Sequence, residues 1–134
     1  MLYSLDITVP ANTTKANKIN THVKIWKGVI YEYEIVFPPG CAGLVKCAIY
    51  LGGHQIIPVN EGSWLSGDAF PITGKEFLEL EKETNDIFIW TYNEDNVDEH
   101  TVTVRLHVLE KKYLLPTGAT EGILASLKAM FKKE

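Results

Sequence analysis

The sequence has few of the features that mark a nucleic-acid-binding, membrane or secreted protein. Only two of its 134 residues are cysteines, and no apolar run approaches the length of a membrane span. Acidic residues outnumber basic ones, and the formal net charge of -4 gives no basic surface for a nucleic acid. The N-terminus lacks a basic stretch followed by a long apolar one, so it shows no signal peptide. We therefore expect neither a nucleic-acid nor a membrane partner.

Motifs for catalysis and metal binding are also missing. The four histidines stand in no recognised ligand or base spacing, and Ser63 and Ser66 have no histidine or aspartate partner in a motif. The acidic segment 94–99 lacks the glycine and the distant glutamate of a calcium loop, so we interpret it as a solvated hairpin turn. The Gly-Gly-His segment at residue 52 lacks the helix and lysine of a phosphate-binding loop. The sequence predicts no catalytic residue, no cofactor and no metal ligand.

The two cysteines, Cys41 and Cys47, are predicted to be reduced. A disulfide between them has no support without a secretory signal, and two ligands are too few for a zinc site. Cys47 lies in an apolar run, where a free cysteine typically behaves as a small core residue.

What the sequence does contain is a strongly alternating segment, residues 24–40, with the sequence KIWKGVIYEYEIVFPPG. A period of two is typical of a half-buried strand, and Pro38-Pro39-Gly40 then ends it. One face of this strand is predicted to be core, and it comprises Val29, Tyr31, Tyr33, Ile35 and Phe37.

Similar segments recur along the chain and predict a mainly β fold. An irregular loop is expected at 60–74, because that stretch is rich in glycine, asparagine, serine and aspartate. With 46% hydrophobic residues the chain is long enough for one domain with a real core. We expect an antiparallel β-sandwich, jelly-roll or immunoglobulin-like, of seven to eight strands. The predicted strands are residues 2–9, 21–27, 29–37, 45–51, 54–59, 77–81, 86–92 and 99–109.

The C-terminal segment has a different pattern and predicts an α-helix. We divide the chain into a sandwich domain, 1–115, and a tail, 116–134, that begins at a Pro-Thr-Gly hinge and contains an amphipathic helix capped by Thr120. The apolar stripe of this helix is expected to contact a neighbouring subunit or another virion protein; the alternative is that it folds back over the open end of the sandwich. The stripe consists of Ile123, Leu124, Leu127, Met130 and Phe131.

Three aromatic residues, Trp64, Trp90 and Tyr92, complete the set of interface candidates. Roles in the core or in a subunit contact are favoured, because Trp90 lies in the middle of a predicted strand. The alternative is a platform on which sugar rings stack. The sequence alone leaves both interpretations open.

Several segments of the sequence resemble small uncharacterised proteins associated with tailed-phage and prophage structural genes. The shared features are the FPPG corner, the HQIIP strand, the WLSGD loop and the YNEDNVDEHTV finish, within roughly residues 20–109. The resemblance implies a β-sandwich virion component: a capsid-decoration, head-to-tail or fibre-associated subunit. It assigns no functional residue, and the tail lies outside it.

These observations together favour a non-enzymatic structural protein that forms a homo-oligomer or binds other virion proteins. The expected location is the virion, with the cytoplasm as the alternative. A carbohydrate-binding module is the second hypothesis. An enzyme is the third, and it requires a pocket that gathers His54 or His100 with carboxylates from separate loops.

Overall fold

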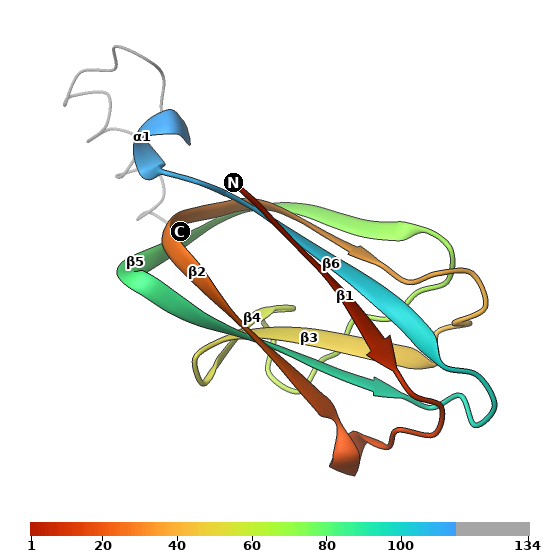
Figure 1. The fold of residues 1–134 in the computed structure, drawn as a ribbon. Coiled ribbons are helices and arrows are strands. Elements are labelled where there is room, and N and C mark those ends of the chain that lie inside the picture. The colour runs from red at the N-terminus through yellow and green to blue at the C-terminus, as the bar shows by residue number, and fades with distance from the viewer. Residues whose placement is uncertain (115–134) are drawn as a thin grey trace.

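The computed structural model describes residues 1–114, which form a mainly β structure (Figure 1). All strand pairs are antiparallel, and they form one six-stranded sheet in the order β1-β6-β2-β5-β3-β4. A 3-10 helix, η1 (Lys15–Asn17), precedes β2, and a one-turn helix, α1 (Lys111–Leu114), follows β6. The strands are β1 (Leu2–Val9), β2 (Ile19–Val36), β3 (Val45–Leu51), β4 (His54–Ile57), β5 (Pro71–Asn93) and β6 (His100–Leu109).

Two long strands, β2 with 18 residues and β5 with 23, connect the two parts of the sheet. They pair with each other from one end to the other, between the pairs Ile19–Thr91 and Val36–Pro71. The C-terminal part of β2 also pairs with β6, and the C-terminal part of β5 pairs with β3. We call β1, β6 and the adjoining parts of β2 and β5 the first half, and the remainder with β3 and β4 the second half.

The ladder between β2 and β5 is interrupted where one half passes into the other. Its register shifts between Trp26 and Gly28, and the β5 residues opposite this shift bulge outward. The buried side-chain amide of Asn85 holds the bulge, because it donates to the carbonyl oxygens of Ile25 (3.3 Å) and Lys82 (2.8 Å). Residue 28 must be glycine, since a Cβ there would lie 2.9 Å from the carbonyl oxygen of Leu109.

The hydrophobic core lies on the inner face of the sheet and draws on both halves. Val102 and Val104 come from the first half and Ile49 and Ile87 from the second, and they belong to one cluster of buried side chains. Both halves therefore contribute to one core. Each fully buried aliphatic side chain stabilises such a core by about 1.5–3 kcal/mol relative to an exposed one. One face of β6 also belongs to the core, because His100, Val102, Val104, Leu106 and Val108 are all buried.

The predicted core face of β2 is wrong at two adjacent positions, 30 and 31. Val29, Ile35 and Phe37 are buried as expected, but Ile30, which was assigned to the opposite face, is also fully buried. The cause is a register shift between Ile30 and Glu32, which moves Tyr31 out of the alternation. The ring of Tyr31 instead lies edge-on to the ring of His107, with the centroids 5.8 Å apart.

The expectation of seven to eight strands also differs from the structure. Predicted strands 21–27 and 29–37 are one strand, β2, and predicted strands 77–81 and 86–92 both belong to β5. The glycine and the polar residues between them form bulges within continuous ladders rather than turns. Residues 71–74, expected in the irregular loop, pair with β2, where Ile72 packs against the core.

A tyrosine fills the space above a glycine within this added segment. Tyr33 pairs with Gly74 across the ladder, and a Cβ on Gly74 would come within 2.5 Å of the phenol ring. An aromatic ring over a strand glycine covers backbone that would otherwise be exposed. The half-buried Tyr33 therefore packs against the core as predicted. Its position over Gly74 follows from the pairing of β2 with β5, which the sequence does not show.

Both cysteines are free and buried, and Cys47 belongs to the core as predicted. The boundary between the two predicted domains, the Pro-Thr-Gly hinge and the amphipathic stripe lie outside the described residues, which end at 114.

One buried hydroxyl predicts a stabilising substitution. The Oγ1 of Thr91 is buried without a hydrogen-bond partner in the described part of the chain, so its burial is uncompensated. Thr91→Val keeps the shape and is expected to stabilise the fold by about 1 kcal/mol, which is about 3–5 °C in Tm. The measurement is thermal unfolding by circular dichroism.

The matched control is Thr73→Val, which makes the same change at an exposed position in a regular part of the same strand. Its Tm is expected to stay within about 1 °C of wild type, because surface substitutions away from special features change little. A lower Tm for Thr91→Val than for the control would contradict the prediction.

Candidate functional site

Aromatic side chains gather on the outer face of the second half. Trp90 and Phe88 alternate with buried residues along β5, so both point outward. Tyr50 of β3 lies directly opposite Phe88 in the ladder, and its ring belongs to the same surface. We call Tyr50, Phe88 and Trp90 the aromatic face. All three side chains are half-buried, so each presents part of its ring to solvent.

Polar neighbours on β2 and the loop before it hold two of these rings. The Nζ of Lys18 lies 5.2 Å from the centroid of the Trp90 ring, a cation–π contact. The imidazole of His22 stacks on Phe88 with centroids 4.7 Å apart, and its Nε2 lies 2.7 Å from Oδ1 of Asp86. The aromatic face therefore has a fixed apolar centre and a polar rim along β2.

A shallow hollow of ≈ 330 Å³ opens between the rings. The hydroxyl of Tyr50 donates to Oε1 of Gln55 at 3.1 Å, which fixes the ring on one side of it. The Gly52-Gly53 turn has no side chains to close the hollow. Its lining is Asn20, Tyr50, Gly52, Gly53, Phe88 and Trp90.

The structure brings the three predicted aromatic candidates close to one another but gives them different roles. Trp90 is part of the aromatic face, and the half-buried Trp64 packs edge-on against Tyr92, with centroids 4.8 Å apart. Tyr92 itself is buried, at 8% exposure, so it supports Trp64 from below rather than offering a surface of its own. Of the aromatic face, the sequence predicted only Trp90, and it missed Phe88 on the same strand. It also missed Tyr50, Lys18 and His22, whose signal was weak because each lies on a different segment.

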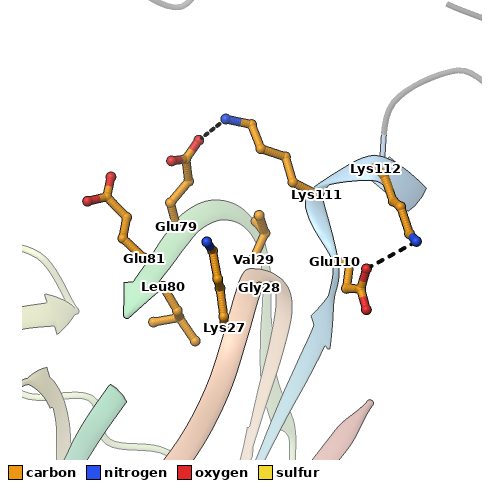
Figure 2. A pocket seen from close by; sticks show the side chains of 9 residues that line it. All are labelled: Lys27, Gly28, Val29, Glu79, Leu80, Glu81, Glu110, Lys111 and Lys112. Carbon is orange, nitrogen blue, oxygen red and sulfur yellow. Dashed lines mark ion pairs between the residues drawn. The ribbon is translucent and has the colours of Figure 1, made fainter. Parts of the chain in front are cut away.

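A larger hollow of ≈ 680 Å³ lies where β6 passes the bend of β2 (Figure 2). Figure 2 shows Lys111 paired with Glu79 and Lys112 with Glu110; the N–O distances are 2.7 and 3.4 Å. The hydrogen bond to Glu110 raises the pKa of Lys112. The lining holds as many lysines as glutamates, so it selects neither an anion nor a cation. It consists of Lys27, Gly28, Val29, Glu79, Leu80, Glu81, Glu110, Lys111 and Lys112.

The acidic segment 94–99 is a structural turn built around Asp95. One carboxylate oxygen accepts hydrogen bonds from the backbone amides of Val97 (2.9 Å) and Asp98 (3.1 Å). The other lies 2.9 Å from Nε2 of the buried His100. The hydrogen bond from His100, with those two amide bonds, lowers the pKa of Asp95 to about 2. His100 and Asp95 therefore stabilise a turn. The enzyme hypothesis requires carboxylates from separate loops, whereas the carboxylate beside His100 belongs to the adjacent turn.

The thiol nearest to this turn is not activated. Burial raises the pKa of Cys41, and the negative charges of Asp68 and Asp95 raise it further. Burial also raises the pKa of Cys47 to about 12. Both groups stay protonated at neutral pH, and a protonated thiol is a poor nucleophile. His54 lies exposed at the start of β4, far along the chain from any of these groups.

Within residues 1–114, no three histidine, cysteine, aspartate or glutamate side chains are placed to hold a metal ion. No helix in that range is long and apolar enough to span a membrane. The arrangement on the aromatic face offers flat apolar surfaces with a polar rim, which is chemistry for binding.

Comparison of the chain with protein-family models, with curated proteins and with solved structures finds no match.

The Asp95 turn predicts a specific response to acid. The pKa of Asp95 is about 2 in the fold, against an ordinary value of 3.8. Because the folded value is the lower one, the ionised carboxylate stabilises the fold above pH 3.8, and this contribution is lost as the pH falls towards 2. Asp95→Asn is therefore expected to lower Tm at neutral pH and to flatten its fall between about pH 5 and pH 2.

The measurement is Tm against pH, with Asp98→Asn as the control in the same turn. The control is expected to follow the wild-type profile, because no side-chain hydrogen bond of Asp98 contributes to the turn. Equal slopes for wild type and Asp95→Asn would show that the turn does not depend on the ionised carboxylate.

Proposed function

We propose that the protein is a non-enzymatic structural protein that acts by assembling with copies of itself through the aromatic face. The observation that supports this is the concentration of half-exposed rings at Tyr50, Phe88 and Trp90, surrounded by a polar rim. Aromatic residues at the centre of a polar rim are typical of protein–protein contacts. The rings are already held by neighbours such as Lys18 and His22, so little conformational entropy is lost on contact.

We further propose that the bent sheet is a two-layer β-sandwich and that the assembly is a virion component. The single core cluster shared by both halves supports the sandwich. The proposal of a virion component is supported by the resemblance to proteins associated with tailed-phage structural genes. This resemblance lies in the FPPG corner and in the WLSGD and YNEDNVDEHTV segments. A capsid-decoration, head-to-tail or fibre-associated subunit is the class we favour.

The test of self-association is the mass in solution of wild type and of Trp90→Ala. We expect wild type to exceed the monomer mass in multi-angle light scattering. Loss of a central tryptophan in a contact typically costs 2 kcal/mol or more, so the dissociation constant should rise about 30-fold. Far-ultraviolet circular dichroism checks that the variant is folded.

The matched control is Phe70→Ala, which removes an exposed ring, at 80% exposure, away from the aromatic face. It should leave the mass unchanged. A wild-type protein that stays monomeric up to about 1 mM would refute self-association.

A carbohydrate-binding module is the second candidate, because the hollow beside Trp90 and Tyr50 is open and has the polar Asn20 at its rim. Stacking of sugar rings on tryptophan and tyrosine is the chemistry that this arrangement supports. Binding of wild type to a glycan array, lost in Trp90→Ala and kept in Phe70→Ala, together with a monomeric mass, would favour it over assembly.

A further inference from the structure

The first strand of the sheet, β1, has a backbone edge that no other strand within residues 1–114 covers. It lies at one end of the strand order and pairs with β6 alone. The amide of Val108 donates to the carbonyl oxygen of Met1 at 2.7 Å, so these two residues form a hydrogen-bonded pair. Hydrogen-bonded and non-hydrogen-bonded pairs alternate in an antiparallel ladder. The backbone groups that point away from β6 are therefore those of Leu2, Ser4, Asp6 and Thr8.

These outward groups have no backbone partner within residues 1–114. None of the hydrogen bonds outside the regular ladders uses the amide or carbonyl of these four residues, and all four are exposed. The strand, LYSLDITV, has no proline, no lysine and no bulge, and its one charged residue is Asp6. The other end of the strand order, β4, differs, because it has only four residues and stops before Pro58.

We propose that β1 pairs with β1 of a second copy of this chain, antiparallel and about a two-fold axis. The two sheets then continue into each other through backbone hydrogen bonds. This proposal rests on the proposed self-association, and it adds a second contact surface that is separate from the aromatic face.

The charges along the edge select one register. Pairing in which Asp6 faces the second copy's Asp6 places two carboxylates opposite each other, which is unfavourable. Pairing in which Ser4 faces the second copy's Asp6 brings a hydroxyl donor to a carboxylate. That register also places Leu2 opposite the second copy's Thr8, so all four outward residues of each copy are paired.

The same register matches the apolar side chains on the inner face. Leu5 then lies opposite the second copy's Leu5, on the two-fold axis, and Tyr3 lies opposite the second copy's Ile7. Tyr3 and Leu5 are only half-buried where β1 ends the sheet, although both pack against the core. Pairing covers their exposed parts, and such cross-strand apolar pairs stabilise a sheet. A second copy therefore supplies both the backbone partners and the matching side chains.

The first test uses the charge pattern. Ser4→Asp places a carboxylate opposite the second copy's Asp6, twice per dimer, and should weaken dimerisation at least tenfold in sedimentation equilibrium. Within one chain Ser4 lies opposite Arg105, so the fold accommodates the aspartate. Adding Asp6→Asn to Ser4→Asp removes the repulsion and should restore the dimer. Thr84→Asp, at an exposed position of β5, is the control and should not change the dissociation constant.

The second test is hydrogen exchange of wild type above and below its dissociation constant. Pairing predicts slower exchange in the dimer at the amides of Leu2, Ser4, Asp6 and Thr8. The amides between them are bonded to β6 and should be protected in both states. Residue-resolved nuclear magnetic resonance separates the two sets.

The outcomes separate this proposal from the proposed function. In one outcome, Ser4→Asp leaves the oligomer intact, Trp90→Ala weakens it, and hydrogen exchange finds no protection at the β1 edge. That result would overturn the β1 pairing and keep self-association. A dimer that Ser4→Asp weakens and Trp90→Ala leaves intact would support the β1 pairing and reject the aromatic face. A monomer at all concentrations would overturn both.

Discussion

The antiparallel ladder between β2 and β5 is the constraint on which the rest of the structure depends. Each of the two strands belongs to both halves of the sheet, and every other strand is attached to one of them, directly or through a neighbour. The bulges at Gly28 and around Asn85 interrupt this ladder where one half of the sheet passes into the other.

Alternation in the sequence predicts the inner face well wherever a strand is regular. Val102 and Val104 on β6 and Ile87 and Ile89 on β5 are buried as their period of two requires. The pattern fails at residues 30–31 and 81–85, where the register of the ladder between β2 and β5 shifts. A bulge depends on contacts with the partner strand, such as the hydrogen bond between Asn85 and Ile25. The sequence of one strand by itself therefore does not predict the bulge.

The aromatic face likewise combines residues that are close in the sequence with residues that only strand pairing brings together. Phe88 and Trp90 share a face because they are two residues apart, and the sequence predicts that directly. Tyr50 joins them only through the register between β3 and β5, and Lys18 reaches Trp90 from a segment 72 positions earlier in the chain. Such contacts depend on tertiary pairing. The sequence therefore predicted one of the three rings, Trp90, as an interface residue and neither of the polar groups that hold them.

The pairing of β1 with β6 joins the two ends of the described chain, since Leu2 lies opposite His107. A ribosome releases the N-terminal residues first, so β1 leaves the exit tunnel about a hundred residues before its partner does. Until then its apolar residues have no neighbouring strand within this sheet. Closure of such a long loop opposes early pairing, and the fold is expected to complete only after β6 has emerged. Of the described strands, β1 is therefore synthesised before the others, and it can pair only once the last of them, β6, has been synthesised.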